Sequence, residues 1–394
     1  MVTAGAKVFR IPMHRRTLWT LYAGNLLTAI GLWFFLPLLP IFITRRGGSP
    51  ALVGIVFAVG LLANAAIRYP AGWAADRWGT RPVILAAMGA YAALFLAYLL
   101  PLPLPALVVV RLLHGAASGA YWPAANGLIG QVTTPSQRGR AFGFMQSTMM
   151  AGMLVGPAIG GFIALFNLSA VFVVSACICG LAAVALAFLP NVRAEASLEI
   201  PFGALRMVRN LAPLILLGAG TSYMIGSFDT IWPLYLTYRG ASTLAVGLSF
   251  VAFAVPATLL SARAGMLGDR FGPRRIVVAA LLATAFFSAL YSFVASVPWL
   301  IGLGLVEGAL TISGGPSLMA EVSRSAQSGR QARTQGVFQT VQVLVQGVGA
   351  VGGGALFALN PAYAFYAIAA VCLLGASAAL RPRWARTRTA NEVL

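Results

Sequence analysis

Twelve apolar stretches, each long enough to cross a lipid bilayer, run through almost the whole chain. About 20 helical residues span the hydrocarbon core, and lipid permits only helices or closed barrels to cross it. These stretches are too long and too uniformly apolar for barrel strands, which alternate over about ten residues. We therefore predict an all-α membrane protein with twelve transmembrane helices. The expected spans are residues 17–43, 51–74, 82–101, 104–130, 141–166, 168–190, 212–238, 243–264, 275–296, 298–321, 334–358 and 361–380.

The composition agrees with a chain that is solvated mostly by lipid. Of its 394 residues, 59% are hydrophobic and only 9% are charged, whereas a soluble domain carries about 25% charged residues. The first apolar run follows a basic stretch and is itself long enough to span, so we expect no cleavable signal peptide. The three cysteines lie inside apolar runs, where we expect them to act as small packing residues.

Basic residues set the predicted topology. The net charge is +19, and 22 of the 27 basic residues fall in the two termini and in alternate loops, including residues 191–211. The other loops hold only Arg45, Arg46 and Arg239. This bias places both termini in the cytoplasm and the protein in an inner (plasma) membrane of bacterial type. It also explains the charge by topology and by anionic membrane lipids, so no nucleic-acid partner is expected.

The two halves of the chain repeat one another at an offset of 193 residues. Between two apolar runs, Gly72, Asp76, Arg77, Gly79 and Arg81 form a charged turn. The second half keeps the same residue types in register, at Gly265, Asp269, Arg270, Gly272 and Arg274. A parallel repeat predicts two facing bundles related by a pseudo-twofold axis along the membrane normal, with the substrate site on that axis near the midplane. We expect units at residues 1–190 and 212–394, joined by a cytoplasmic linker at residues 191–211.

This duplicated loop pattern resembles the signature of the major facilitator superfamily, and the resemblance covers essentially the whole chain. It implies two pseudo-symmetric six-helix bundles that work by alternating access. Physically, the glycines let helix ends approach closely, and Arg77 and Arg81 could pair with acids of a neighbouring helix end to hold the cytoplasmic side shut. The alternative is an ordinary basic inner turn.

Two further motifs resemble those of the twelve-helix drug–proton antiporters in that family. Arg111 and His114 lie in the fourth span, and the resemblance associates the basic residue with proton coupling. The alternative for Arg111 is snorkelling to an interface. The fifth span carries a glycine- and proline-rich motif that could seal the outer side, or could simply pack small residues closely. Its residues are Gly152, Gly156, Pro157, Gly160 and Gly161.

Two acids lie well inside predicted spans. These are Asp229 in the seventh span and Glu307 in the tenth, which is the repeat partner of His114. A carboxyl group removed from water favours its neutral form, so it can bind a proton on one side and release it on the other. The alternative is a structural ion pair, for example between Glu307 and Arg111. Glu321, at an inner helix end, is expected to pair with loop arginines.

The first span departs from many relatives of that antiporter group, because it offers Asn25 and Thr28 where they carry an acid. This weakens the case for cationic drugs as substrates. An apolar pocket with a few polar groups suits lipophilic or amphipathic solutes. The substrate-binding candidates are polar or aromatic residues of spans near the axis: Asn25, Asn64, Tyr121, Trp122, Asn126, Gln146, Tyr223, Trp232, Gln339, Gln342 and Gln346.

No phosphate-cradling loop, zinc-binding motif or nucleophile elbow is present in the sequence, so we expect neither an enzyme nor an ATP-driven pump. No cofactor and no metal site are expected. The partners expected are a small-molecule substrate, protons and membrane lipids, and the chain is expected to be a monomer. We favour proton-coupled efflux. A sugar or metabolite importer, an uncoupled facilitator, a lipid or lysolipid transporter and a non-transporting receptor are the alternatives.

Overall fold

The computed structural model describes residues 15–193, 204–325 and 331–378, and within them the side chains of residues 135–136, 204–206, 257, 261–269 and 331–333 are not described. This part of the chain is helical and contains no strand. The elements are α1 (Arg15–Phe35), η1 (Leu36–Leu38), α2 (Leu39–Arg45), α3 (Pro50–Trp78), α4 (Thr80–Ala97), α5 (Leu104–Val132), α6 (Pro135–Phe166), α7 (Leu168–Leu186), α8 (Ala204–Tyr238), α9 (Thr243–Phe271), α10 (Pro273–Tyr291), α11 (Val297–Thr311), α12 (Gly314–Arg324), α13 (Gln331–Leu359) and α14 (Pro361–Ala378).

These elements confirm the predicted membrane architecture. Twelve helical segments of the described chain are long and apolar enough to cross a bilayer. Two of the segments are interrupted helices. The first span bends through η1 between Pro37 and Pro40, and the tenth breaks between α11 and α12, just before Pro316. Proline lacks the backbone donor and crowds the preceding turn, which accounts for both interruptions.

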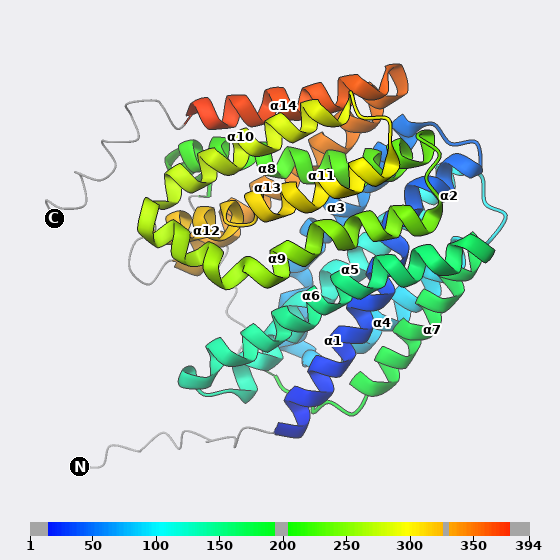
Figure 1. Ribbon diagram of the computed structural model, residues 1–394. Helices are drawn as coiled ribbons and strands as arrows, with labels where there is room; N and C mark the ends of the chain where they lie inside the picture. The colour runs from blue at the N-terminus through cyan, green and yellow to red at the C-terminus, as the bar shows by residue number, and fades with distance from the viewer. Residues whose placement is uncertain (1–14, 194–203, 326–330, 379–394) are drawn as a thin grey trace, which may run out of the picture.

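The helices form two bundles that face each other along two seams (Figure 1). Within the first bundle, α1 packs against α6 and α7, and α3 packs against α5. Within the second, α8 packs against α13 and α14, and α9 packs against α11. The seams between the bundles are α3 with α13 and α6 with α9. The repeat maps α3 onto α9 and α6 onto α13, so the two seams are equivalent. Part of the predicted linker, residues 194–203, lies outside the described residues.

Both seams are tightest at one end of the molecule, which we call the opposite end because it lies away from the start of α1. A Cβ atom on Gly54 would collide with the Ala350 carbonyl oxygen, and one on Gly247 would collide with that of Pro157. The offset of 193 converts the first contact into the second. The Thr243 hydroxyl also donates to the Gly161 carbonyl oxygen across the second seam, at 3.0 Å. Glycine permits this backbone approach, so the opposite end is closed.

The other end of the bundles, which we call the basic end, carries the duplicated charged turns. Gly79 and Gly272 join their helices with φ values of 102° and 85°, a region that glycine reaches without strain. Figure 1 shows the helices spreading apart toward this end, where α1 begins and α14 ends. The surroundings of Gly265 and the side chain of Asp269 lie outside what the structure describes. Arg77 lies over the Trp73 ring, 5.4 Å from its centroid.

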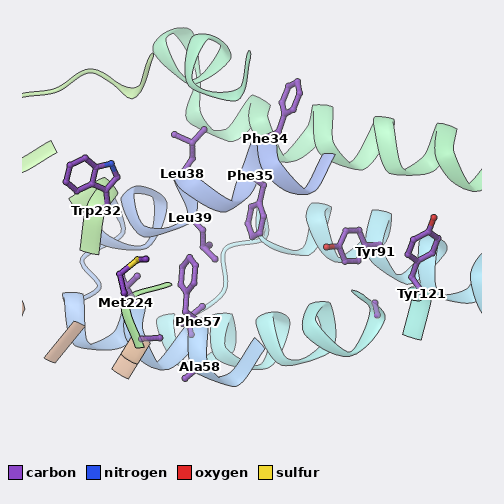
Figure 2. Close-up of a cluster of buried hydrophobic side chains, with 14 of the residues drawn as sticks. Phe34, Phe35, Leu38, Leu39, Phe57, Ala58, Tyr91, Tyr121, Met224 and Trp232 are labelled. Atoms are coloured by element: carbon purple, nitrogen blue, oxygen red, sulfur yellow. The ribbon is translucent and has the colours of Figure 1, made fainter. Parts of the chain in front are cut away.

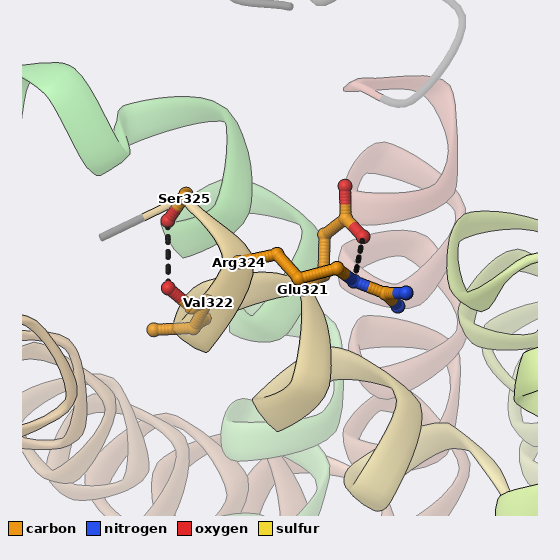
Figure 3. Close-up of polar contacts among 4 residues, drawn as sticks. All are labelled: Glu321, Val322, Arg324 and Ser325. Carbon is orange, nitrogen blue, oxygen red and sulfur yellow. Dashed lines mark hydrogen bonds and ion pairs between the residues drawn. The ribbon is translucent and has the colours of Figure 1, made fainter. Parts of the chain in front are cut away.

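Glu321 forms the ion pair that the sequence predicts at an inner helix end. Its Oε2 lies 3.5 Å from Nε of Arg324, one helical turn further along α12 (Figure 3). Within the described residues, Arg77 and Arg81 form no ion pair with an acid of another helix in this conformation. The physical reason is that the two bundles are separated at the basic end, where those acids would have to approach.

Candidate substrate and proton site

Arg111 of α5 is a buried cation at the interface between the bundles. It is 8% exposed, and its guanidinium carbon lies 5.8 Å from the ring centroid of Phe35 and 5.4 Å from that of Phe57. Figure 2 shows the Phe57 ring beside Met224 of the second bundle, with Phe35 nearby on the first. The Nε atom has no hydrogen-bond partner among the described residues. Cation–π contacts therefore hold the guanidinium, and its charge is left without a close counter-ion.

Asp229 of α8 is the acid of the second bundle that lies within electrostatic range of this cation. It is half-buried, and it lies close enough to Arg111 for a Coulombic interaction. Within the described residues it forms no ion pair within 4.0 Å and no hydrogen bond to another side chain. Attraction between opposite charges is strong where water is scarce. The structure thus brings together two of the four predicted coupling residues, one from each bundle, without locking them in contact.

His114 does not reach this interface. It is fully buried inside the first bundle, where its ring lies 4.2 Å from that of Tyr91, 4.6 Å from that of Phe95 and 5.3 Å from that of Phe35, measured between centroids. Neither ring nitrogen has a hydrogen-bond partner in the described chain. His114 is therefore a packing residue of the first bundle's aromatic core in this conformation.

Glu307 occupies the equivalent enclosure in the second bundle. It is 1% exposed, and its Oε2 accepts a hydrogen bond of 2.6 Å from the Tyr291 hydroxyl. The alternative of an ion pair with Arg111 is wrong, because Glu307 is enclosed within the second bundle and its partner is a tyrosine. The Oε1 atom has no partner among the described residues.

The aromatic enclosures themselves obey the repeat. Phe35, Tyr98 and Phe172 surround one another in the first bundle. At an offset of 193, Phe228, Tyr291 and Phe365 do the same in the second. The duplicated core thus places His114 and Glu307 inside their own bundles. Arg111 and Asp229 lie where the bundles meet, and their repeat partners, Gly304 and Leu36, are not polar side chains.

Asn25 cross-links three helices of the first bundle. Its amide nitrogen donates to the Met145 carbonyl oxygen at 3.2 Å and to the Thr148 hydroxyl at 2.7 Å. Its amide oxygen accepts a hydrogen bond of 3.2 Å from the Tyr121 hydroxyl. Both amide protons are used and the residue is 1% exposed. The bundle itself therefore uses both donors of Asn25, which also contributes to the lining of the pocket described below.

Gln342 has the corresponding role in the second bundle. Its amide oxygen accepts from the Ser222 hydroxyl at 2.6 Å, and its nitrogen donates to the Ile215 carbonyl oxygen at 3.3 Å. A Cβ atom on Gly218, the repeat partner of Asn25, would lie 2.5 Å from this nitrogen. Each half therefore ties the same pair of helices with one amide, which is supplied by the first helix in one half and by the fifth in the other.

Replacing Asn25 with leucine is expected to lower stability more than transport specificity. The change removes three hydrogen bonds, two of them buried, and leaves the Tyr121 hydroxyl without its acceptor. We expect a loss of about 2 kcal/mol or more in the free energy of unfolding. Thermal unfolding of the purified protein measures this loss. Asn126→Leu is the matched control, since Asn126 is exposed and forms no hydrogen bond with other described residues. Equal melting temperatures for the two variants would contradict the cross-link.

A pocket lies among α1, α4, α5 and α6 of the first bundle. Its lining combines aromatic and methionine side chains with a few hydroxyl and amide groups and carries no charge. The lining residues are Asn25, Thr28, Ala29, Leu32, Met88, Tyr91, Ser118, Tyr121, Trp122 and Met149. Predicted candidates Tyr121 and Trp122 are thus brought together in it. The sequence gives no signal for Met88, Ser118 or Met149, because nothing local distinguishes them from other residues of a membrane helix.

The remaining substrate candidates are scattered over several environments. Asn126, Gln146 and Gln339 are exposed, whereas Tyr223 is 9% exposed and packs against α13 within the second bundle. Trp232 donates its indole hydrogen to the Ser249 hydroxyl at 2.9 Å, so it ties α8 to α9. Gln346 is half-buried. The structure does not gather these residues around one point.

The glycines of the fifth-span motif divide between two neighbours. Gly152, Gly156 and Gly160 lie against α1 of the same bundle, facing Ala29, Trp33 and Phe34. Pro157 and Gly161 lie on the seam with α9, at the closed opposite end. The contacts of Pro157 and Gly161 agree with the expected seal between the bundles. The contacts of Gly152, Gly156 and Gly160 are close packing within one bundle, as the alternative proposes.

Comparisons with known proteins agree with this geometry. The family model described as Major Facilitator Superfamily matches residues 21–242 and again residues 214–392. The chain is 30% identical over 335 residues to the multidrug resistance protein MdtG of Salmonella typhi, with 76% of this chain and 80% of the relative covered. It is 28% identical over 352 residues to the class G tetracycline resistance protein of Vibrio anguillarum, with 84% and 88% covered.

Among solved structures, the chain resembles a bacterial homologue of the human lysosomal transporter Spinster in its inward-facing, occupied conformation. The TM-score is 0.79 at 15% sequence identity, and 95% of this chain and 97% of the other are covered. At this identity the likeness concerns the fold alone.

Proposed function

Because the chain belongs to the major facilitator superfamily, we propose that it is a secondary transporter that exports small lipophilic or amphipathic solutes in exchange for protons. Its fold and its drug-efflux relatives indicate a transporter rather than an enzyme. The observation that supports proton coupling is the placement of Asp229 opposite Arg111, across the interface between the bundles. A carboxyl group in that position changes the attraction between the bundles whenever it gains or loses a proton.

The proposed cycle uses this pair to link proton binding to alternating access. With Asp229 ionised, its attraction to Arg111 stabilises the state that is closed at the opposite end, as seen here. A substrate that enters from the basic end offsets this attraction, and the bundles then open toward the opposite end. Protonation of Asp229 from that side displaces the substrate, and the bundles return with the proton bound in its place. Release of the proton at the basic end restores the starting state.

The orientation follows from the charge bias. The basic end, with both termini, faces the cytoplasm of a bacterial-type inner membrane, and the opposite end faces outward. The protein acts as a monomer in contact with membrane lipids, and the residues of the charged turns, from Gly72 to Arg81 and from Gly265 to Arg274, close the basic end in the alternate state. His114 and Glu307 support the site from within their bundles.

The available energy is sufficient for efflux without ATP. One elementary charge that crosses about 100 mV supplies about 2.3 kcal/mol. At about 1.4 kcal/mol per factor of ten, this sustains a concentration gradient of about fortyfold per proton.

Transport by the purified protein in proteoliposomes tests the proposal. We expect a lipophilic dye to accumulate in the lumen when the lumen is acidic, in exchange for protons, and we expect the accumulation to collapse when an ionophore dissipates the pH gradient. Empty liposomes correct for passive partitioning of the dye. Dye movement that equilibrates but never concentrates, whatever the pH gradient, would identify an uncoupled facilitator.

A further inference from the structure

Arg68 of α3 is a charged residue inside a membrane span that the transport cycle leaves without a role. It lies ten residues before the end of α3 at Trp78 and is exposed. Charged residues at such depth are costly, and they mark substrate or ion pathways by default. Within the described residues Arg68 forms no ion pair.

The helical position of Arg68 turns it away from lipid. On α3, Gly54 and Ala58 face α13 of the second bundle, while Gly60 and Asn64 face α5 of the first. With 3.6 residues per turn, Arg68 lies roughly 40° from the Gly54 direction, on the side of Asn64. The exposed apolar residues Ile55 and Leu62 lie roughly 120° or more away from it around the helix. Arg68 therefore faces the wedge between α5 and α13, where the two bundles meet.

A chain of hydrogen bonds holds the guanidinium in this place. Nε of Arg68 donates to the Asn64 amide oxygen at 3.1 Å, and the Asn64 nitrogen donates to the Ser118 hydroxyl at 3.0 Å. The terminal nitrogens of Arg68 form no hydrogen bond with other described side chains. Their N–H groups are therefore available for bidentate hydrogen bonds to carboxylate, sulfonate or phosphate oxygens. Ser118 is itself part of the lining of the uncharged pocket.

The charge distribution of the first bundle also favours an anionic solute. Within the described spans, the interior acids Asp229 and Glu307 both belong to the second bundle. The first bundle contributes Arg68 and Arg111 with no acid at comparable depth. A solute bound against this bundle meets positive charge next to an aromatic pocket, which favours an acidic amphiphile over a cation.

We propose that Arg68 is a substrate-binding residue and that the transported solutes carry an anionic group, which the guanidinium binds while the apolar part lies against the aromatic side chains Tyr121 and Trp122 beside Ser118. This rests on the proposed transport function but not on its coupling to protons.

Two dyes with the same ring skeleton test the proposal by equilibrium binding to the purified protein in lipid nanodiscs. They are anilinonaphthalene sulfonate, which is anionic, and N-phenylnaphthylamine, which is neutral. We expect the wild-type protein to bind the sulfonate about tenfold more tightly or better, as a charge-assisted hydrogen-bond pair implies. Arg68→Gln should lose this advantage and leave the neutral dye unchanged. Arg46→Gln removes one positive charge at the opposite end and is the matched control, expected to keep it.

Equal affinities of the wild-type protein for the two dyes, or an undiminished preference in Arg68→Gln, would overturn the proposal. Should Arg68→Gln not fold, Arg68→Lys provides the test, because lysine keeps the positive charge and lacks the bidentate donor geometry of the guanidinium. A reduced sulfonate preference in that variant supports the proposal, and an unchanged one overturns it. These results are separate from proton coupling, since the binding measurement uses no pH gradient.

Discussion

Asp229→Asn is expected to abolish pH-driven accumulation of substrate while leaving substrate counterflow intact. Asparagine keeps the size and shape of the side chain but cannot exchange a proton, so the two bundles no longer respond to the gradient. We expect the accumulation ratio to fall from about fortyfold per 100 mV to unity. Counterflow, in which unlabelled solute drives labelled solute across proteoliposomes without a pH gradient, needs only alternating access and should remain within about threefold of the wild-type rate.

The controls for this prediction separate coupling from general damage. Glu321→Gln removes an acid whose ion pair lies on a helix end, and it should change transport little because such pairs contribute about 1 kcal/mol or less. Arg111→Gln combined with Asp229→Asn should be no worse than the more damaging single change, because interacting residues are not additive. Full pH-driven accumulation by Asp229→Asn would remove this acid from the mechanism and favour an importer or a facilitator.

Gly54→Leu is expected to prevent closure of the opposite end and so to stop transport. Even a Cβ atom added at this position would collide with the Ala350 carbonyl oxygen. This oxygen belongs to the backbone of α13, which cannot move aside as a flexible side chain can. The state in which the opposite end is closed is therefore destabilised by several kcal/mol, as expected for overpacking of a tight interface. Since 1.4 kcal/mol is a factor of ten, transport should fall at least a hundredfold.

The distance between the two bundles at the opposite end provides the measurement. Spin labels at Arg46 and Arg239, in a background without the native cysteines, report one site from each bundle. We expect the wild-type protein to show a short distance and Gly54→Leu a longer one. Gly302→Leu is the control, because no neighbouring atom lies within 4 Å of a Cβ at that position. An unchanged distance together with normal transport in Gly54→Leu would show that the seam is not needed for closure.

The duplicated glycine contacts explain why both seams close together. Gly54 against Ala350 becomes Gly247 against Pro157 under the same offset that relates the charged turns. Because the two contacts lie on opposite sides of the pseudo-twofold axis, closing one brings the other into register. A rocking motion about the centre then moves both at once, as expected for parallel repeats. We expect Gly247→Leu to reproduce the effect of Gly54→Leu for this reason.

The candidate site was only partly predictable from the sequence. A charged residue inside an apolar run is visible in one chain, and Arg111, Asp229 and Glu307 were found in that way. Their partners were not, because Glu307 and Tyr291 lie on different helices, and Arg111 and Asp229 on different bundles. The same holds for Asn25 and Gln342, which remain predicted substrate contacts, because the hydrogen bonds by which their amides join two helices could not be read from the sequence.

Hydropathy, charge bias and the internal repeat determined by themselves the number of spans, their limits and the two-bundle plan. Each of these is a property of short stretches, since a span must be long and apolar wherever it lies in the bilayer. Only the tertiary structure decided which side chains face each other across the interface and which end is closed. Those outcomes depend on how helix faces more than 100 residues apart pack together, and packing is set by the shape of both partners at once. Arg68 shows the difference most clearly: its charge was visible in the sequence, but its direction was not.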